Sequence, residues 1–453
     1  MKLTAFASFV ILISLTAAQA QWTRQTFDTR ASFRGISVVN EKVVWASGTG
    51  GSVIRTIDGG KTWKVMEVPG AIKLDFRDVE AFDANTAYVL SIGNGDASRI
   101  YKTVDGGATW KLQFTNTNAK AFFDAIACWD QSNCLAMSDP VEGHYVLIST
   151  SDGGANWKQI VSNDLPPARD GEAAFAASGT CLITLGKSTA FLVTGGEGAH
   201  VFRSDDRGIT WSIAETPIIN GTPGSGIFSI AFRNDLHGTI VGGNYEKPNE
   251  KEHTIAFTRD GGKSWYAGEG LSGYRSSVAY IDDKTVIAVG TNGTDISTDR
   301  GATWKKISDE NLNAVAARGK NAVWAVGPNG VVVRLTSMTG ANKAVASSTT
   351  RPPSITRLDL GHTEISSKCA RTGRACSDKR VVGVRTVPVK WNGPHKYVYT
   401  VTAGKIVGDG PQVKWDLSDV QPGKYAITVG ITIPYADRWG VLGSTETREV
   451  VVR

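Results

Sequence analysis

The sequence predicts an all-β protein in which a seven-bladed β-propeller is followed by a small β-sandwich. Three observations carry this prediction. One turn pattern occurs six times before residue 305, a seventh group of strands follows the last copy, and the segment after a Pro-rich stretch alternates apolar and polar residues between turn signals.

The repeated pattern is Thr/Ser-x-Asp-x-Gly-x-Thr/Ser/Asn-Trp, and its copies end at Trp63, Trp110, Trp157, Trp211, Trp265 and Trp304. Successive copies are therefore 47, 47, 54, 54 and 39 residues apart. Four strands of about 5 to 6 residues with short turns need this length. A period of this size indicates stacked or radially arranged units, so each copy predicts one propeller blade.

Each copy is a turn by its own chemistry. An Asp side chain accepts bonds from backbone N–H groups further along the chain, and Gly supplies the positive φ that the turn needs. We therefore expect a structural rather than a catalytic role for the six aspartates, which are Asp58, Asp105, Asp152, Asp206, Asp260 and Asp299.

The seventh blade has only three strands of its own, predicted near residues 313–317, 322–326 and 330–335. Its missing outer strand is expected at the other end of the chain, because residues 21–25 (Gln-Trp-Thr-Arg-Gln) match residues 109–113 (Thr-Trp-Lys-Leu-Gln) after a box. Pairing these ends removes the open edge of the ring. The propeller is thus expected over residues 21–336.

Both ends of the chain differ from the repeats. Residues 1–20 carry Lys2, an apolar stretch and Ala18-Gln-Ala20, which is typical of a secretory signal cleaved near Ala20 and too short to span a bilayer. We expect a periplasmic or secreted mature chain without a transmembrane segment. Residues 337–353 read as a linker, and residues 354–453 as the β-sandwich.

Five cysteines fit an oxidising compartment. The spacing predicts local disulfides between Cys128 and Cys134 and between Cys369 and Cys376, with Cys181 left as a buried apolar thiol. The formal net charge of +6 is too small for this length to indicate nucleic-acid binding. Motifs for zinc, nicotinamide or acyl-hydrolase chemistry do not occur, so we expect no cofactor and no metal.

Candidate functional residues come from propeller geometry. The starts of the inner strands and the loops between second and third strands converge at one mouth of the central channel. The residues expected there are Arg34, Arg77, Asp124, Asp139, Glu172, Asn244, Tyr245 and Arg275. This mixed-charge set predicts a recognition surface. Two alternatives are solvated surface charges and a carboxylate pair of a glycoside hydrolase drawn from Asp124, Asp139 and Glu172.

The turn pattern resembles the Asp box, or bacterial neuraminidase repeat. The Arg-Ile-Pro segment of sialidases is absent. The chain is more similar to the photosystem II stability/assembly factor-like family of seven-bladed Asp-box propellers, through residues 122–127 (Phe-Phe-Asp-Ala-Ile-Ala), 136–140 (Ala-Met-Ser-Asp-Pro) and 171–179 (Gly-Glu-Ala-Ala-Phe-Ala-Ala-Ser-Gly). Residues 421–429 (Gln-Pro-Gly-Lys-Tyr-Ala-Ile-Thr-Val) resemble a late hairpin of immunoglobulin-like or PKD-like domains.

The resemblance has functional implications. Photosynthetic members of the family are non-catalytic chaperones that bind a membrane protein through an arginine-rich patch, which implies such a role for Arg34, Arg77 and Arg275 here. We therefore expect an exported binding or assembly scaffold whose partner is another extracytoplasmic or membrane protein. The alternative is a secreted carbohydrate-active protein, either a sialidase-like or other glycoside hydrolase or a glycan binder.

Overall fold

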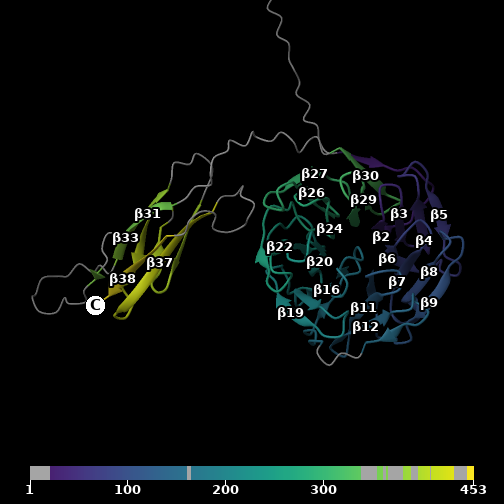
Figure 1. The fold of residues 1–453 in the computed structure, drawn as a ribbon, viewed down its shortest axis with the longest axis horizontal. Coiled ribbons are helices and arrows are strands. Elements are labelled where there is room, and N and C mark those ends of the chain that lie inside the picture. Colours follow the sequence, from purple (N-terminus) through teal and green to yellow (C-terminus); the bar gives the residue numbers. More distant parts are fainter. Residues whose placement is uncertain are drawn as a thin grey trace, which may run out of the picture. The chain divides into compact units, whose positions relative to one another are not determined.

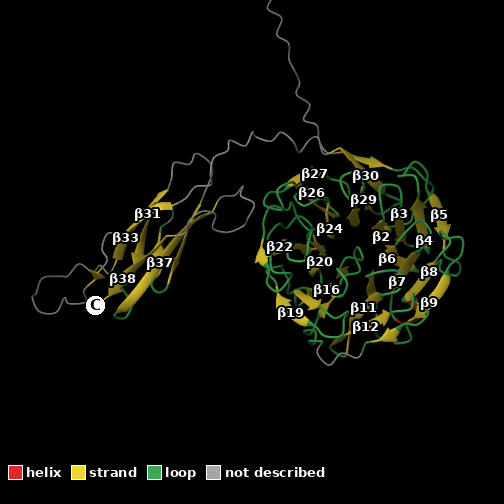
Figure 2. Cartoon of the chain, in the orientation of Figure 1, coloured by secondary structure: helices red, strands yellow, loops and turns green. Residues whose placement is uncertain are grey.

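The computed structural model describes residues 21–160, 165–337, 355–360, 364–365, 381–388, 396–408, 410–432 and 446–452. The expected signal peptide, residues 338–353 of the expected linker, and the pair Cys369 and Cys376 lie outside these ranges. The chain forms two compact units, which are coloured by sequence in Figure 1 and by secondary structure in Figure 2.

The larger unit contains seven antiparallel sheets, or blades, arranged around a ring (Figure 1). The first strands of neighbouring blades lie beside one another, and these are the inner strands of the ring. The first three sheets are β2 (Phe33–Val38), β3 (Val44–Gly48), β4 (Ser52–Thr56) and β5 (Lys64–Glu67); β6 (Asp75–Ala81), β7 (Ala87–Ile92), β8 (Arg99–Thr103) and β9 (Lys111–Thr115); and β10 (Phe123–Cys128), β11 (Cys134–Val141), β12 (His144–Thr150) and β13 (Lys158–Gln159). A short 3₁₀ helix, η1 (Gly95–Ala97), precedes β8.

The next sheets depart once from the regular pattern. Blade 4 contains β15 (Leu182–Leu185), β16 (Thr189–Val193), β18 (His200–Ser204) and β19 (Ser212–Glu215). Blade 5 contains β20 (Ser225–Phe232), β21 (Gly238–Asn244), β22 (Ile255–Thr258) and β23 (Tyr266–Ala267), and it is extended to six strands by β14 (Glu172–Ala173) and β17 (Gly195–Gly196). Glu172 therefore precedes the inner strand of blade 4 instead of starting it.

The ring closes between the two ends of the propeller sequence. Blade 6 contains β24 (Ser277–Tyr280), β25 (Val286–Gly290), β26 (Gly293–Ser297) and β27 (Lys305–Ser308). Blade 7 contains β28 (Ala314–Ala317), β29 (Val323–Val326) and β30 (Val332–Ser337), with β1 (Gln21–Arg24) as its outer strand. Trp22 stands opposite Leu335 in this antiparallel pairing, so the first strand of the described chain completes the last blade.

The six turn aspartates accept hydrogen bonds from residues of their own turns, as the sequence predicts. In the first turn, Asp58 accepts bonds from the backbone N–H of Thr62 at 2.9 Å and from its hydroxyl at 2.6 Å, while Gly60 N–H donates to Thr56 Oγ1. The side-chain bond from Thr62 is the main reason that the pKa of Asp58 falls to about 2. The same pattern of aspartate bonds recurs at Asp105, Asp152, Asp206, Asp260 and Asp299.

The turns also join neighbouring blades. A cation on the third strand of one blade lies over an aromatic ring of its own second strand and donates to the first glycine of the next blade's turn. The pairs are Lys102 to Gly153 O over Tyr88, Arg203 to Gly261 O over Phe191, and Arg334 to Gly59 O over Trp324. The contact of Arg334 spans the closure of the ring, from blade 7 to blade 1.

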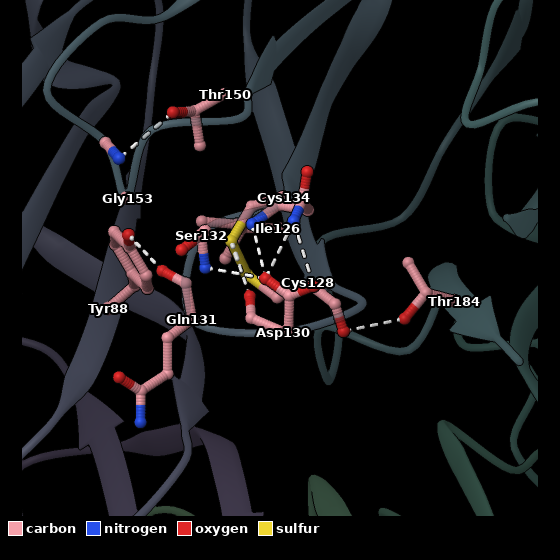
Figure 3. Close-up of a disulfide and its surroundings, with 12 residues drawn as sticks. Tyr88, Ile126, Cys128, Asp130, Gln131, Ser132, Cys134, Thr150, Gly153 and Thr184 are labelled. Carbon is pink, nitrogen blue, oxygen red and sulfur yellow. Dashed lines mark hydrogen bonds between the residues drawn. A yellow bond between two sulfur atoms is a disulfide. The ribbon is translucent and has the colours of Figure 1, made fainter. Parts of the chain in front are cut away.

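The disulfide between Cys128 and Cys134 closes the hairpin of β10 and β11, where the two cysteines stand directly opposite each other with Cα atoms 4.0 Å apart (Figure 3). Both adjacent blades contact this hairpin. Tyr88 of blade 2 donates to the carbonyl of Gln131, and Thr184 of blade 4 donates to the carbonyl of Cys128. The disulfide therefore fixes a turn that connects three blades, and Cys181 is a buried free thiol.

The smaller unit is a β-sandwich of two four-stranded sheets. One contains β31 (Ile355–Leu360), β33 (Val381–Pro388), β36 (Gln412–Asp416) and β35 (Lys405–Val407), and the other contains β32 (Glu364–Ile365), β38 (Glu446–Val452), β37 (Gly423–Thr432) and β34 (Lys396–Val401). Its core joins Val382, Val384 and Trp415 of the first sheet to Ile427 and Val450 of the second.

Candidate functional site

A pocket of about 360 Å³ lies where the inner strands of the propeller begin, and we call it the channel-mouth pocket. Residues from five of the seven blades line it, together with residues 175–177, which precede the first strand of blade 4. The lining residues are Arg34, Arg77, Phe175, Ala176, Ala177, Phe228, Tyr245, Tyr274, Ser276, Thr291 and Asn313. Of the residues that the sequence predicts at the channel mouth, this pocket brings together Arg34, Arg77 and Tyr245.

Two arginines supply the charge of the pocket. Arg77 pairs with Asp75 at 2.8 Å and donates to the carbonyl of Ala176, while Arg34 donates to the carbonyl of Ala177. Burial lowers the pKa of Arg34, and the positive charge of Arg77 lowers it further. Among the described residues Arg34 has no carboxylate partner, so the pocket holds two guanidinium groups against the single carboxylate of Asp75.

The remaining wall is aromatic. Phe175 stacks on Phe228 with ring centroids 3.9 Å apart, and Tyr245 and Tyr274 meet Phe228 edge to face. Tyr245 is half exposed, whereas the other three rings are largely covered. Such stacked and edge-to-face contacts hold rings in fixed positions. The pocket therefore combines a rigid apolar wall with an excess of positive charge.

A short segment, residues 172–177, carries one side of the pocket, and we call it the strap. Its start is held by Glu172, whose carboxylate accepts bonds from His200 Nδ1 at 2.7 Å, from the Thr194 hydroxyl and from Arg169 N–H. Its middle is held by Ala174 N–H, which donates to Asp139. Its end supplies the two carbonyls that orient Arg77 and Arg34.

His200 lies between two carboxylates, that of the buried Glu172 and that of the exposed Glu215. Its Nε2 lies 3.1 Å from Glu215, and both ring nitrogens can donate only when the imidazole is protonated. Burial lowers the pKa of His200, but the bond and charge of Glu172 with the charge of Glu215 outweigh it and raise the pKa. Burial raises the pKa of Glu172, and its bonds from His200 and Thr194 outweigh this and lower it.

This pair predicts a pH dependence of folding stability. The stabilisation from Glu172 is complete above its unfolded pKa of 4.5 and is lost as pH falls through the lowered folded value. The stabilisation from His200 is complete below its unfolded pKa of 6.5 and is lost as pH rises through the raised pKa of the folded state. Glu172→Gln should therefore cost about 1.5–3 kcal/mol near pH 6 and less near pH 9, measured by urea unfolding. His144→Gln, at an exposed histidine, is the control, and an equal cost at both pH values would contradict the assignment.

The structure corrects the position of Arg275. Its side chain is fully buried and pairs with Asp295, also fully buried, with Arg275 Nη2 and Asp295 Oδ2 2.6 Å apart. The adjacent Tyr274 lines the pocket instead. Successive residues of an extended chain point to opposite faces, so an error of one residue in the expected position exchanges the two side chains.

The three acidic residues predicted at the channel mouth, Asp124, Asp139 and Glu172, are largely buried and not exposed to solvent. Asp124 is buried, and burial together with the charge of Asp139 raises its pKa well above the usual range. Burial raises the pKa of Asp139 to about 6, against the bond from Ala174 N–H. Glu172 is 4% exposed. None of the three lines the channel-mouth pocket, so the structure does not bring them together in this cavity.

Asn244 is a positioning residue. It is 5% exposed, and its side-chain oxygen accepts a bond from Glu246 N–H while its amide donates to Thr222. These bonds fix the turn that carries Tyr245. The sequence does not identify four further residues of the pocket, which are Phe228, Tyr274, Ser276 and Thr291. Aromatic side chains such as Phe228 and Tyr274 are usual in the interior of a β-protein. Only the convergence of the blades in space places these two rings around one opening.

Within the described ranges, no group of three or more His, Cys, Asp or Glu side chains is arranged to hold a metal ion. None of the helical segments in the part of the chain that the structure describes has the length and apolar character to cross a lipid bilayer.

The fold is similar to solved β-propellers. YCF48 bound to a D1 peptide is 18% identical, covers 70% of this chain and 97% of its own, and gives a TM-score of 0.52. YCF48 from Cyanidioschyzon merolae (17%; 70% and 99%; 0.47) and the WD40 repeats of RRP9 (12%; 70% and 98%; 0.50) are also similar. No family model and no curated protein sequence matches the chain. At these identities the likeness shows the propeller fold alone.

Proposed function

We propose that the protein is an exported, non-catalytic scaffold that binds a carboxylate-bearing segment of another extracytoplasmic protein in the channel-mouth pocket. The main support is the positive charge of this pocket. Arg34 and Arg77 lie beside four aromatic rings, and the one carboxylate paired with them in the described part of the chain is that of Asp75. A half-buried guanidinium without a carboxylate partner costs free energy, and a ligand carboxylate would offset that cost through charge-assisted hydrogen bonds.

Further features support a binding role and an extracytoplasmic location. The solved propeller YCF48 is described with a bound peptide, and we extend peptide binding to this chain as part of the proposal. The Cys128–Cys134 disulfide suits an oxidising compartment, in agreement with the signal sequence expected in residues 1–20. We assign the propeller to the Asp-box group and the sandwich to the immunoglobulin-like or PKD-like domains as part of the same proposal.

The test is capture from an envelope fraction of the source organism with immobilised mature chain. The variant is Arg34→Gln with Arg77→Gln, and the matched control is Lys64→Gln with Lys111→Gln, which removes the same charge from exposed outer strands. Each lost charge-assisted bond is worth about 1.5–3 kcal/mol, so affinity for the partner should fall by about 100-fold or more in the variant and stay unchanged in the control.

The result is read by mass spectrometry of the retained material. A protein that cross-links to the strap or to Tyr245 in the wild type and is lost in the arginine variant supports the proposal. Equal retention of the protein by wild type and variant would overturn the proposal. Retention of glycans alone would also overturn it and would favour the carbohydrate-active alternative.

A further inference from the structure

A second cavity lies on the outer face of the sheet β31-β33-β36-β35 in the sandwich, with a volume of about 820 Å³. We call it the sandwich hollow. Its floor is Gly383, in the middle of β33, between the buried side chains of Val382 and Val384. Because side chains alternate along a strand, residue 383 is on the face opposite to the core, and without a side chain it leaves the sheet open there.

Among the described residues, no contact or backbone angle requires a glycine at position 383. Its φ lies outside the left-handed region that favours glycine, and a Cβ built there meets no atom within 4 Å. Glycine in a strand interior weakens the strand and often marks a place where a ligand approaches closely. The fold would therefore accept a larger residue, and the missing side chain is best explained by an occupant of the hollow.

The strand register places polar groups around this floor. Gly383 stands opposite Lys414, which stands opposite Val407, and the neighbouring row joins Arg385 to Gln412. Lys414, Arg385, Gln412 and Val407 are exposed. Opposite and diagonal neighbours on one face are about 5 and 7–8 Å apart, so the two cations, the amide and the apolar side chain surround one opening. Asp359, opposite Arg385, adds an acceptor at the edge.

We propose that the sandwich hollow binds an anionic polysaccharide, with Arg385 and Lys414 contacting its acidic groups and a sugar ring seated over Gly383. The side-chain amide of Gln412 provides a donor and an acceptor for hydroxyl groups, and Val407 provides an apolar contact for a ring face. A peptide fits less well, because β33 and β36 are each paired on both sides and offer no free strand edge for backbone pairing.

The test uses the mature chain and measures affinity electrophoresis in gels that contain polygalacturonate, neutral dextran or poly-L-glutamate. Polygalacturonate should retard the wild type, and dextran should not. Gly383→Val, which fills the hollow with a residue that strands favour, should weaken retardation about tenfold or more, as should Arg385→Gln with Lys414→Gln. Lys424→Gln, at an exposed lysine of the other sheet, should leave retardation unchanged.

The outcomes separate this site from the channel-mouth pocket. Arg34→Gln with Arg77→Gln should keep full retardation by polygalacturonate, and loss in that variant would place the glycan in the propeller and overturn this inference. Unretarded wild type, unchanged retardation in Gly383→Val with its fold intact by circular dichroism, or equal retardation by poly-L-glutamate would each overturn it too.

Discussion

Asp295→Ala is expected to lower the free energy of unfolding of the propeller by about 3–5 kcal/mol, because it leaves the Arg275 charge buried and unpaired. Both side chains are fully buried. Arg275 donates to Asp295 Oδ2 from Nε at 2.9 Å, and its Nη1 donates to the Asn292 side chain and to the carbonyl of Tyr274. Urea unfolding followed by tryptophan fluorescence measures the change.

Two controls make this result specific. Arg275→Met with Asp295→Leu removes both charges and should cost less than Asp295→Ala, since a buried pair replaced by apolar side chains leaves no uncompensated charge. Glu142→Ala breaks the exposed pair with Lys120 and should cost under about 1 kcal/mol. If Asp295→Ala cost no more than Glu142→Ala, the Arg275 charge would have another partner and the assignment would be wrong.

The buried pair also bears on the pocket. Arg275 donates to the carbonyl of Tyr274, whose ring forms part of the aromatic wall beside Phe228. Loss of Asp295 should therefore disturb the position of this ring as well as the stability of blade 6. Tyr274 and Arg275 are consecutive residues just before β24, one lining the pocket and the other buried, so a change that destabilises the buried pair should also alter the shape of the pocket.

Much of the propeller could be predicted from the sequence because its signals are local. The Asp and Gly residues of each box specify a turn through bonds within seven consecutive residues, residues 56–62 in the first copy, and the distance between boxes leaves room for four strands. The match of Trp22 to Trp110 indicates the outer strand of the last blade, and β1 does pair with β30. A disulfide between cysteines at the two ends of one hairpin is local in the same sense, and Cys128 and Cys134 form it.

The candidate site was harder to predict because it depends on contacts between distant blades. Glu172 reads as a charged residue at the start of an inner strand, but β14 pairs with the insertion strand β17, and this pairing buries its carboxylate against His200. Phe175 of the strap stacks on Phe228 of blade 5 to form a pocket wall. Neither burial nor stacking of this kind has a signature within one short window of sequence.

The second large effect is expected at the closure of the ring, with Gly60→Ala. Gly60 has a φ of +87°, and a Cβ there would lie 2.4 Å from the ring of Trp324 and 2.6 Å from the side-chain oxygen of Gln25. The backbone strain costs about 1–2 kcal/mol and the overpacking about 1–3 kcal/mol, so the free energy of unfolding should fall by about 2–5 kcal/mol. Urea unfolding checks this value.

Gly70→Ala is the matched control, because Gly70 has a similar φ of +76° but a Cβ there meets nothing within 4 Å. The difference between the two variants isolates the contact with Trp324. In a Trp324→Leu background the extra cost of Gly60→Ala should shrink, since the atoms that obstruct the new methyl group are gone. Equal costs for the two glycines would show that strain alone makes the turn need glycine.

The same contact explains why the second glycine of the box matters more than a turn alone requires. Gly60 belongs to blade 1 and Trp324 to blade 7, so the ring can close only if the turn of the first blade lies directly against the indole of the last. Gly262 and Phe191, and Gly154 and Tyr88, repeat this packing between other neighbours. Gly60→Ala should therefore separate the two ends of the propeller first, and hydrogen exchange should rise in β1 and β30 before it rises in β10 or β20.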